Sequence, residues 1–192
     1  MSRSSNELLA RSTNKPALFV EIFERHGQAI HSYLVRRAGS QQAEDLFSEV
    51  WLRAFKARAT YDTSRGDALP WIYGVARNTL RSHWRYGTRA YAGAHSTYAD
   101  DASDLSYDPW PDVDGEMDAL SLSAALHEAL AALEPADREV ILLSAWEQLE
   151  PKEIAEVLGM PAGTVRWRLH KARSALQNTN LRPTPISQEI RQ

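Results

Sequence analysis

The stretch PKEIAEVLGMPAGTVRWRLHKAR, residues 151–173, has the pattern of two short helices joined by a tight turn. Gly159 is placed to end the first helix, because glycine reaches the left-handed conformation without a side-chain clash. Pro161 is placed to begin the second helix, since its fixed φ angle suits the first helical position. The apolar residues of the second helix recur at helical spacing: Val165, Leu169, Ala172 and Leu176. The stretch therefore predicts a helix-turn-helix, the motif whose second helix enters the major groove of DNA.

The other positions of that second helix are mostly basic or aromatic. They are Arg166, Trp167, Arg168, His170, Lys171 and Arg173. A cationic helix of this kind suits contacts with phosphates and base edges. An ordinary helical hairpin with a hydrated basic face has the same pattern, and the stretch alone leaves that alternative open.

The composition limits what else the chain can be. With 192 residues it is long enough for one domain or two small ones. It contains no cysteine, which excludes disulfides and thiolate metal sites, and its six histidines show no metal-ligand spacing. No apolar run approaches the ~20 residues that cross a membrane, and the N-terminus lacks the apolar segment of a signal peptide. We therefore expect no cofactor, no metal, no small-molecule substrate, no membrane insertion, and a location in the reducing cytoplasm.

The net charge of −3 conceals three blocks of different sign. Residues 1–89 carry 14 Lys and Arg against 8 Asp and Glu. Residues 90–137 carry 11 Asp and Glu and no Lys or Arg, and residues 138–192 carry 8 Lys and Arg against 6 Asp and Glu. A protein that binds nucleic acid does not need a basic total, because a local basic surface is sufficient.

The first half of the chain predicts helices after a polar N-terminus, residues 1–15, that we expect to fray. Apolar residues at helical spacing indicate helices at three ranges: 16–38, 41–57 and 69–86. In the second of these, Asp45, Glu49 and Arg53 are each four residues apart and form one polar row. A hydrated face stabilised by an acid–arginine pair explains that row without any partner.

The third helix carries arginines at every fourth position: Arg77, Arg81 and Arg85. No acid occurs between Asp67 and Asp100 to neutralise them. An unbalanced arginine row suits the phosphates of DNA, and the neighbouring aromatic residues suit stacking on unpaired bases. The alternative is a hydrated basic face over an aromatic core.

The second half begins with a change of character. Residues 87–118 have Gly, Pro and Ser, no helical period, and eight acids from Asp100 to Asp118, as in a flexible linker. Helical patterns resume at 119, and the polar tail after Leu176 is expected to be disordered. The expected fold is all-α, with two small helical domains joined by a flexible acidic linker. The expected boundaries are 16–87 for the first domain, 88–118 for the linker, 119–177 for the domain with the helix-turn-helix, and 178–192 for the tail.

Three stretches together resemble RNA polymerase sigma factors of the sigma-70 family, in the extracytoplasmic-function (ECF) group. AEDLFSEVWLRAFK at 43–56 resembles the stretch that holds core polymerase. YDTSRGDALPWIYGVARNTLRSHWR at 61–85 resembles the part that reads and melts the −10 element. LEPADREVILLSAWEQLEPKEIAEVLGMPAGTVRWRLHKARSAL at 133–176 resembles the domain that reads the −35 element. The resemblance implies a promoter-specificity subunit rather than an enzyme.

The resemblance also implies which residues make the contacts. Core RNA polymerase would be held by Asp45, Leu46, Glu49, Val50 and Arg53. The −10 element would be contacted by Asp62, Arg77, Asn78, Arg81, Trp84 and Arg85, with the loop near 60–68 accepting a flipped base. The −35 element would be contacted by Thr164, Arg166, Trp167, Arg168, His170, Lys171 and Arg173.

Two positions depart from the family pattern. Trp167 stands where the family usually carries a small polar residue, which implies a contact with a deoxyribose or a partner. Glu150 stands where a Ser or Thr cap is expected, and because glutamate caps less well, we expect a softer turn there. The acidic linker is expected to imitate RNA in the polymerase cleft, and an anti-sigma factor is a possible further partner.

Other classes of protein are less consistent with the sequence. A DNA-binding regulator that works without polymerase would not need the stretches 43–56 and 61–85. An enzyme would need a nucleophile–base pair, a phosphate loop or metal spacing, and Glu147, Glu150, Glu153 and His170 provide none of these. A purely structural adaptor would not need the arginine rows.

Overall fold

The computed structural model describes residues 3–92 and 124–178, and within these ranges the chain forms helices and no strand. The α-helices are α1 (Ser5–Ser12), α2 (Phe19–Ala38), α3 (Ser40–Ala57), α4 (Ala68–Ala92), α5 (Ala124–Ala131), α6 (Pro135–Ala145), α7 (Pro151–Leu158) and α8 (Ala162–Asn178). Three short 3₁₀ turns are Pro16–Leu18, Arg58–Thr60 and Thr63–Arg65. The all-α prediction is confirmed. Helix α4 continues past position 87, where the linker was expected to begin, and ends at Ala92. The rest of the expected linker, up to position 118, and the tail from 179 lie outside the described residues.

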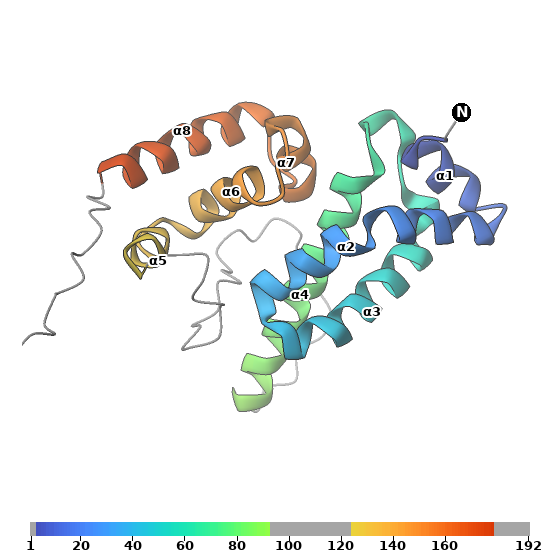
Figure 1. Ribbon diagram of the computed structural model, residues 1–192, viewed down its shortest axis with the longest axis horizontal. Helices are drawn as coiled ribbons and strands as arrows, with labels where there is room; N and C mark the ends of the chain where they lie inside the picture. The colour runs from blue at the N-terminus through green and yellow to red at the C-terminus, as the bar shows by residue number, and fades with distance from the viewer. Residues whose placement is uncertain (1–2, 93–123, 179–192) are drawn as a thin grey trace, which may run out of the picture.

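The first domain is built by α2, α3 and α4 around an aliphatic and aromatic core (Figure 1). The apolar stripe that predicted α3 lies inside: Leu46, Val50, Trp51 and Ala54 are buried. Trp51 packs edge-on against Phe19 and Phe23 of α2, an arrangement that aromatic rings favour. The stripe therefore fixes which face of α3 is buried and leaves Asp45 outside.

The expectation of a frayed N-terminus is wrong, because residues 5–12 form α1. The Ser4 side chain caps this helix by accepting a hydrogen bond from the backbone N–H of Glu7 at 3.2 Å. Leu8 and Leu9 are completely buried in the core. Two buried leucines and a capped first turn are enough to dock a short helix that would be marginal alone.

The second domain contains the predicted helix-turn-helix, formed by α7 and α8. Gly159 ends α7 with φ 64° and ψ 33°, the left-handed conformation expected of it. The softer turn expected at Glu150 is not found, because Glu150 and Glu153 form a capping box. In it, the Glu153 carboxylate accepts a hydrogen bond from the Glu150 backbone N–H at 2.7 Å.

A buried arginine joins α5 to α6. The Arg138 guanidinium donates hydrogen bonds to three carbonyl oxygens at the end of α5, those of Leu130 at 2.6 Å, Ala131 at 2.6 Å and Leu133 at 2.8 Å. Helix ends leave carbonyls without partners inside the helix, so this single side chain acts as the C-terminal cap of α5.

The two domains are in contact rather than apart, which corrects the expectation of separate bodies. In Figure 1, α7 lies on the side of the second domain that faces α4. Gly74 of α4 comes so close that a side-chain Cβ there would lie 3.9 Å from the Val157 carbonyl oxygen of α7. Local sequence patterns carry no information about this contact, because it joins residues far apart in the chain.

Candidate nucleic-acid interface

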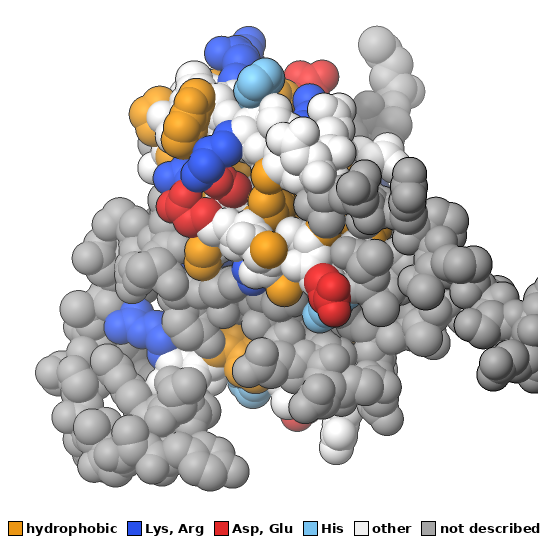
Figure 2. Space-filling view, turned by 90° about the vertical axis from the view of Figure 1, so that its left-hand side faces the viewer, with side chains coloured by type: hydrophobic (Ala, Val, Ile, Leu, Met, Phe, Trp, Pro, Cys, Tyr) orange, Lys and Arg blue, Asp and Glu red, His pale blue; other side chains and the backbone are white. Residues whose placement is uncertain are grey.

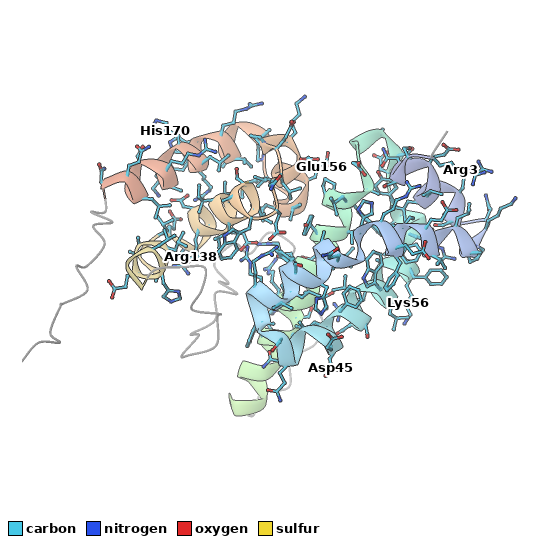
Figure 3. All side chains as sticks on the ribbon, viewed as in Figure 1. Arg3, Asp45, Lys56, Arg138, Glu156 and His170 are labelled. Carbon is cyan, nitrogen blue, oxygen red and sulfur yellow. The ribbon has the colours of Figure 1, made fainter. Side chains whose placement is uncertain are left out.

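Helix α8 presents its basic residues on the outer side of the second domain. Val165, Leu169 and Ala172 are buried and hold the helix against α6 and α7. The residues that these three leave exposed include Arg166, Trp167, His170, Lys171 and Arg173, while Thr164 and Arg168 are partly buried. The labelled His170 lies on the outer side of α8 in Figure 3. The amphipathic pattern thus places the predicted DNA-reading face on the surface.

Two cations of α8 are held by acids of the same domain. Asp137, buried in the first turn of α6, accepts a hydrogen bond from Arg168 Nη1 at 2.7 Å and lies 2.6 Å from Lys171 Nζ. Glu134 lies 2.9 Å from Lys171 Nζ. Hydrogen bonds to Asp137 and then to Glu134 raise the pKa of Lys171 above its ordinary value. Figure 2 shows blue and red side chains directly against one another near the top of the second domain's outer face.

Trp167 stands beside these ion pairs and is 58% exposed. The Arg168 guanidinium carbon lies 5.7 Å, and Lys171 Nζ 5.4 Å, from the centre of a Trp167 ring. Both distances are within the range of cation–π attraction. The indole is therefore fixed against the paired cations, while most of its surface remains available to a ligand.

The arginine row predicted on α4 is not an exposed track in this structure. Arg77 and Arg81 are only 3% and 5% exposed, which corrects the expectation for these two residues. Trp84 and Arg85 are partly buried, and Asn78 is exposed. The domain contact is the reason for the burial of Arg77, because a glutamate of α6 lies against it.

That glutamate is Glu139, which meets two arginines of the first domain. Glu139 Oε2 accepts a hydrogen bond from Arg37 Nη1 at 2.8 Å, and Glu139 Oε1 lies 3.9 Å from Arg77 Nε. Arg37 is 1% exposed. Burial, the largest single influence, would lower the pKa of Arg37, but the attractions of Glu139, Tyr33 and Glu147 and the hydrogen bond to Glu139 together outweigh it and raise the pKa. Arg37 therefore keeps its positive charge although it is buried between the domains.

Glu147, just after α6, makes the second charged contact between the domains. Both of its carboxylate oxygens lie 2.7 Å from Arg36 Nη2. The Tyr73 hydroxyl of α4 donates to the same carboxylate at 3.0 Å. Burial first, and then the charge of Glu147, raises the pKa of Tyr73, so the hydroxyl keeps the proton that it donates.

The sequence interpretation missed both glutamates. A signal was present in the run that contains Glu139, because this acid falls on the same helical face as Leu142 and Leu143. An acid on an apolar face indicates a buried partner, but nothing local identifies that partner.

The fold buries two of the residues predicted to hold core polymerase and leaves the other three at least partly exposed. Asp45 is exposed, and Glu49 and Arg53 form a half-exposed ion pair with 2.5 Å between Oε1 and Nη2. Leu46 and Val50 lie in the domain core, so the expectation that they contact a partner is corrected. The polar row remains as the candidate surface, and Figure 3 labels one of its members, Asp45.

The loop between α3 and α4 is braced by α1. Asp62 caps the turn Thr63–Arg65 by accepting a hydrogen bond from the Ser64 N–H at 2.9 Å. The Tyr61 hydroxyl lies within hydrogen-bond distance of two acceptors, the Gly66 carbonyl oxygen at 2.9 Å and the Asn6 side-chain oxygen of α1, and its single proton serves one or the other. Burial first, and then Asp67, raises the pKa of Tyr61 to about 12. The candidate base-binding loop is therefore held in one shape by a helix that was expected to fray.

Neither a metal-ion site nor a membrane-spanning helix is found among the described residues. Within residues 3–92 and 124–178 no group of His, Asp and Glu could hold a metal ion. No helix in the described part of the chain is long and apolar enough to cross a bilayer.

Family models match both domains. The model for sigma-70 region 2 matches residues 22–90, and the model for sigma-70 region 4 matches residues 123–176. Helix α1 lies before the first match and the helix-turn-helix lies inside the second.

Curated relatives and a solved structure agree with these matches. The ECF RNA polymerase sigma factor SigL of Mycobacterium tuberculosis is 30% identical over 85% of this chain and 89% of SigL. BldN of Streptomyces coelicolor is 27% identical over 80% of this chain, which spans only 57% of BldN. The sigma factor RpoE of Bartonella quintana, solved in complex with the anti-sigma factor NepR, superposes with a TM-score of 0.58 at 20% identity, covering 83% of this chain and 94% of RpoE.

Proposed function

Because this chain belongs to the extracytoplasmic-function group of RNA polymerase sigma-70 factors, we propose how its surfaces divide the work of promoter-specific initiation. The outer row of α3, with Asp45, Glu49 and Arg53, binds core RNA polymerase. The loop before α4, with Asp62, and the end of α4, with Asn78, Trp84 and Arg85, contact the −10 element. Helix α8 reads the −35 element in the major groove.

The observation that carries this proposal is the arrangement of cations on α8. Arg166, His170 and Arg173 are exposed and spaced by four and three residues, so they share one face. Arg168 and Lys171 are instead engaged with Asp137. Base edges are therefore contacted by the first set, with Trp167 beside it and Thr164 at the start of the helix, while Arg168 and Lys171 keep the helix in place.

The proposed partners follow from the same surfaces. They are core RNA polymerase and promoter DNA, and the protein works with them in the cytoplasm without performing chemistry of its own. RpoE of Bartonella quintana forms a complex with an anti-sigma factor. We expect a partner of that kind to regulate this chain as well.

Promoter contact requires the domains to separate. The −10 and −35 elements lie about 25 base pairs apart, or roughly 85 Å at ~3.4 Å per base pair. A compact chain of this length has a radius of gyration of about 16 Å. The docked arrangement therefore represents the protein before it engages a promoter.

The test is transcription in vitro from a library of promoters with core polymerase and the full chain. Selective initiation from promoters that share two elements at constant spacing is expected. Failure to bind core polymerase, or initiation that is no more selective than with core polymerase alone, would contradict the proposal.

A further inference from the structure

The charged contact between the domains has an unusual composition. Three arginines of the first domain, Arg36 and Arg37 of α2 and Arg77 of α4, form a surface that we call the arginine cluster. Two glutamates of the second domain, Glu139 and Glu147, lie against this cluster. The rest of α2 beyond Arg25, and all of α4, contain no Asp or Glu. The only acids placed against the cluster among the described ion pairs therefore come from the other domain.

In such a contact, another anion can take the place of the two glutamates. Burying ionised groups is costly, and pairing with the opposite charge does little more than offset the cost. When the domains separate, both glutamates and all three arginines regain water. An apolar contact of similar size would instead resist separation. The composition favours a docked state that another anion can replace.

The chemistry of the cluster indicates which anion that is. The planar guanidinium group can bind either a carboxylate or a phosphate through two parallel N–H···O hydrogen bonds. Arg77 lies one helical turn before Arg81 and two turns before Arg85, so the cluster continues the α4 row towards α2. Three cations at the edge of a DNA-binding surface suit the phosphate backbone of DNA.

We infer that Glu139 and Glu147 occupy phosphate-binding positions on the arginine cluster, so that the second domain masks a DNA-backbone contact of the first domain within the same chain. Separation of the domains uncovers that contact. The inference goes beyond the proposed function, because Arg36 and Arg37 belong to no surface proposed above. It rests on that function only for the choice of DNA as the polyanion.

The first test replaces the two glutamates in the full chain. The affinity of Glu139→Gln/Glu147→Gln for a fluorescein-labelled 20-base-pair duplex of mixed sequence is measured from 50 to 200 mM salt. The control Glu7→Gln/Glu21→Gln removes the same charge and releases Arg11 and Arg25 from exposed ion pairs. We expect the interdomain variant to bind at least about tenfold more tightly than the control at low salt. Its slope of log K against log salt should be steeper by about 0.9 for each added phosphate contact.

A second variant opens the domains without changing any charge. Gly74→Leu places a larger side chain against the Val157 carbonyl of α7, where even a Cβ would be in contact. Domain separation is followed by energy transfer between dyes at Lys56→Cys and Lys152→Cys, since the natural chain has no cysteine and both lysines are exposed. We expect Gly74→Leu to lower the transfer and to steepen the salt slope. Adding Arg77→Gln should reverse most of that steepening.

The outcomes decide the inference separately from the proposed function. A variant that separates the domains by energy transfer but keeps the salt slope of the wild type would overturn the inference, even if the protein initiates transcription. An interdomain glutamate variant that behaves like its control would do the same. Should the glutamate variant fail to fold by circular dichroism, Gly74→Leu alone decides. Tighter binding to an RNA duplex than to the DNA duplex would overturn the assignment to DNA.

Discussion

Asp137 determines which cations of α8 are available to a ligand. Its buried carboxylate holds Arg168 and Lys171, while Arg166 has no such contact within the described ion pairs. Arg166 and Arg168 are two positions apart on one helix and therefore point in different directions. One is placed to read DNA and the other to fix the helix on its domain.

Substitution of each arginine should separate these roles. Arg166→Ala should weaken binding to a −35 duplex by about 1–3 kcal/mol, the range for a specific arginine–base contact, and leave stability unchanged. Arg168→Ala should lower the free energy of unfolding by about 1–2 kcal/mol, because the buried Asp137 loses a charged partner. Fluorescence anisotropy and urea unfolding measure the two effects. Equal losses of DNA affinity without loss of stability would show that Arg168 is also a reading residue.

The outer row of α3 can be tested in the same way. Asp45→Ala/Glu49→Ala should weaken binding to core polymerase by about tenfold, or ~1.4 kcal/mol, with −35 affinity intact. Glu7→Ala/Glu21→Ala removes the same charge from α1 and α2 and serves as the control. A similar loss in both variants would indicate a general effect of charge rather than a contact by this row.

The sequence predicted this site only in part. It identified every exposed cation of α8, but it could not separate Arg166 from Arg168, because the distinction depends on Asp137, 31 residues earlier. The sequence also could not show that Leu46 and Val50 are buried rather than available to a partner. They belong to a stretch that resembles a binding segment, yet the helical stripe that contains them is needed for the domain core.

At the scale of single elements, α1 is the helix that most changes the interpretation of the first domain. It packs on α2 and α4 and holds the loop that carries Tyr61 and Gly66. The other helices follow from apolar periodicity. The sequence signal for α1 is short: Ser4, then Glu7 three residues later, followed by two leucines. The polar residues around this signal obscured it. The docking of α1 therefore had to come from tertiary structure.

The docking of α1 should depend on pH through His26. Its ring Nε2 lies 2.8 Å from Ser5 Oγ of α1. Burial lowers the pKa of His26 below its ordinary 6.5, with Asp67 acting in the opposite direction. As the pH falls below about 6.5, the unfolded chain therefore binds the proton more readily than the folded chain, and stability falls. Above pH 7 the effect disappears.

Urea unfolding at pH 7.5 and pH 5.5 measures this dependence. His26→Gln does not titrate and serves as the reference, so the wild type should lose more stability than the variant between the two values. Parallel losses in both proteins would show that other groups cause the acid sensitivity.

For the whole molecule, the distinctive feature is that the contact between the two domains contains buried ion pairs. No local pattern predicts this, since Arg37 and Glu139 are 102 positions apart and each lies in an ordinary amphipathic helix. The sequence was sufficient for the helices, the two domains and the family. It was insufficient for their arrangement, which depends on complementary charges in distant parts of the chain.

Engagement of a promoter should abolish this arrangement. With dyes at Lys56→Cys and Lys152→Cys, energy transfer should be high for the free protein and low in the complex with core polymerase and promoter DNA. The reason is the span of roughly 85 Å that two elements 25 base pairs apart impose. Core polymerase without DNA shows which partner causes the separation. High transfer in the complete complex would contradict the proposed division of the promoter between the domains.

The cap that Arg138 provides has a mechanical consequence. When the two domains separate, any tension in the chain that joins them, the tether, reaches the second domain through α5. Eight residues measure about 12 Å as a helix and about 27 Å when extended, so unwinding α5 would lengthen the tether by about 15 Å. Arg138 holds two carbonyls of that helix and the Leu133 carbonyl just after it, so tension should move the second domain as a body. Without Arg138, tension should unravel α5 first.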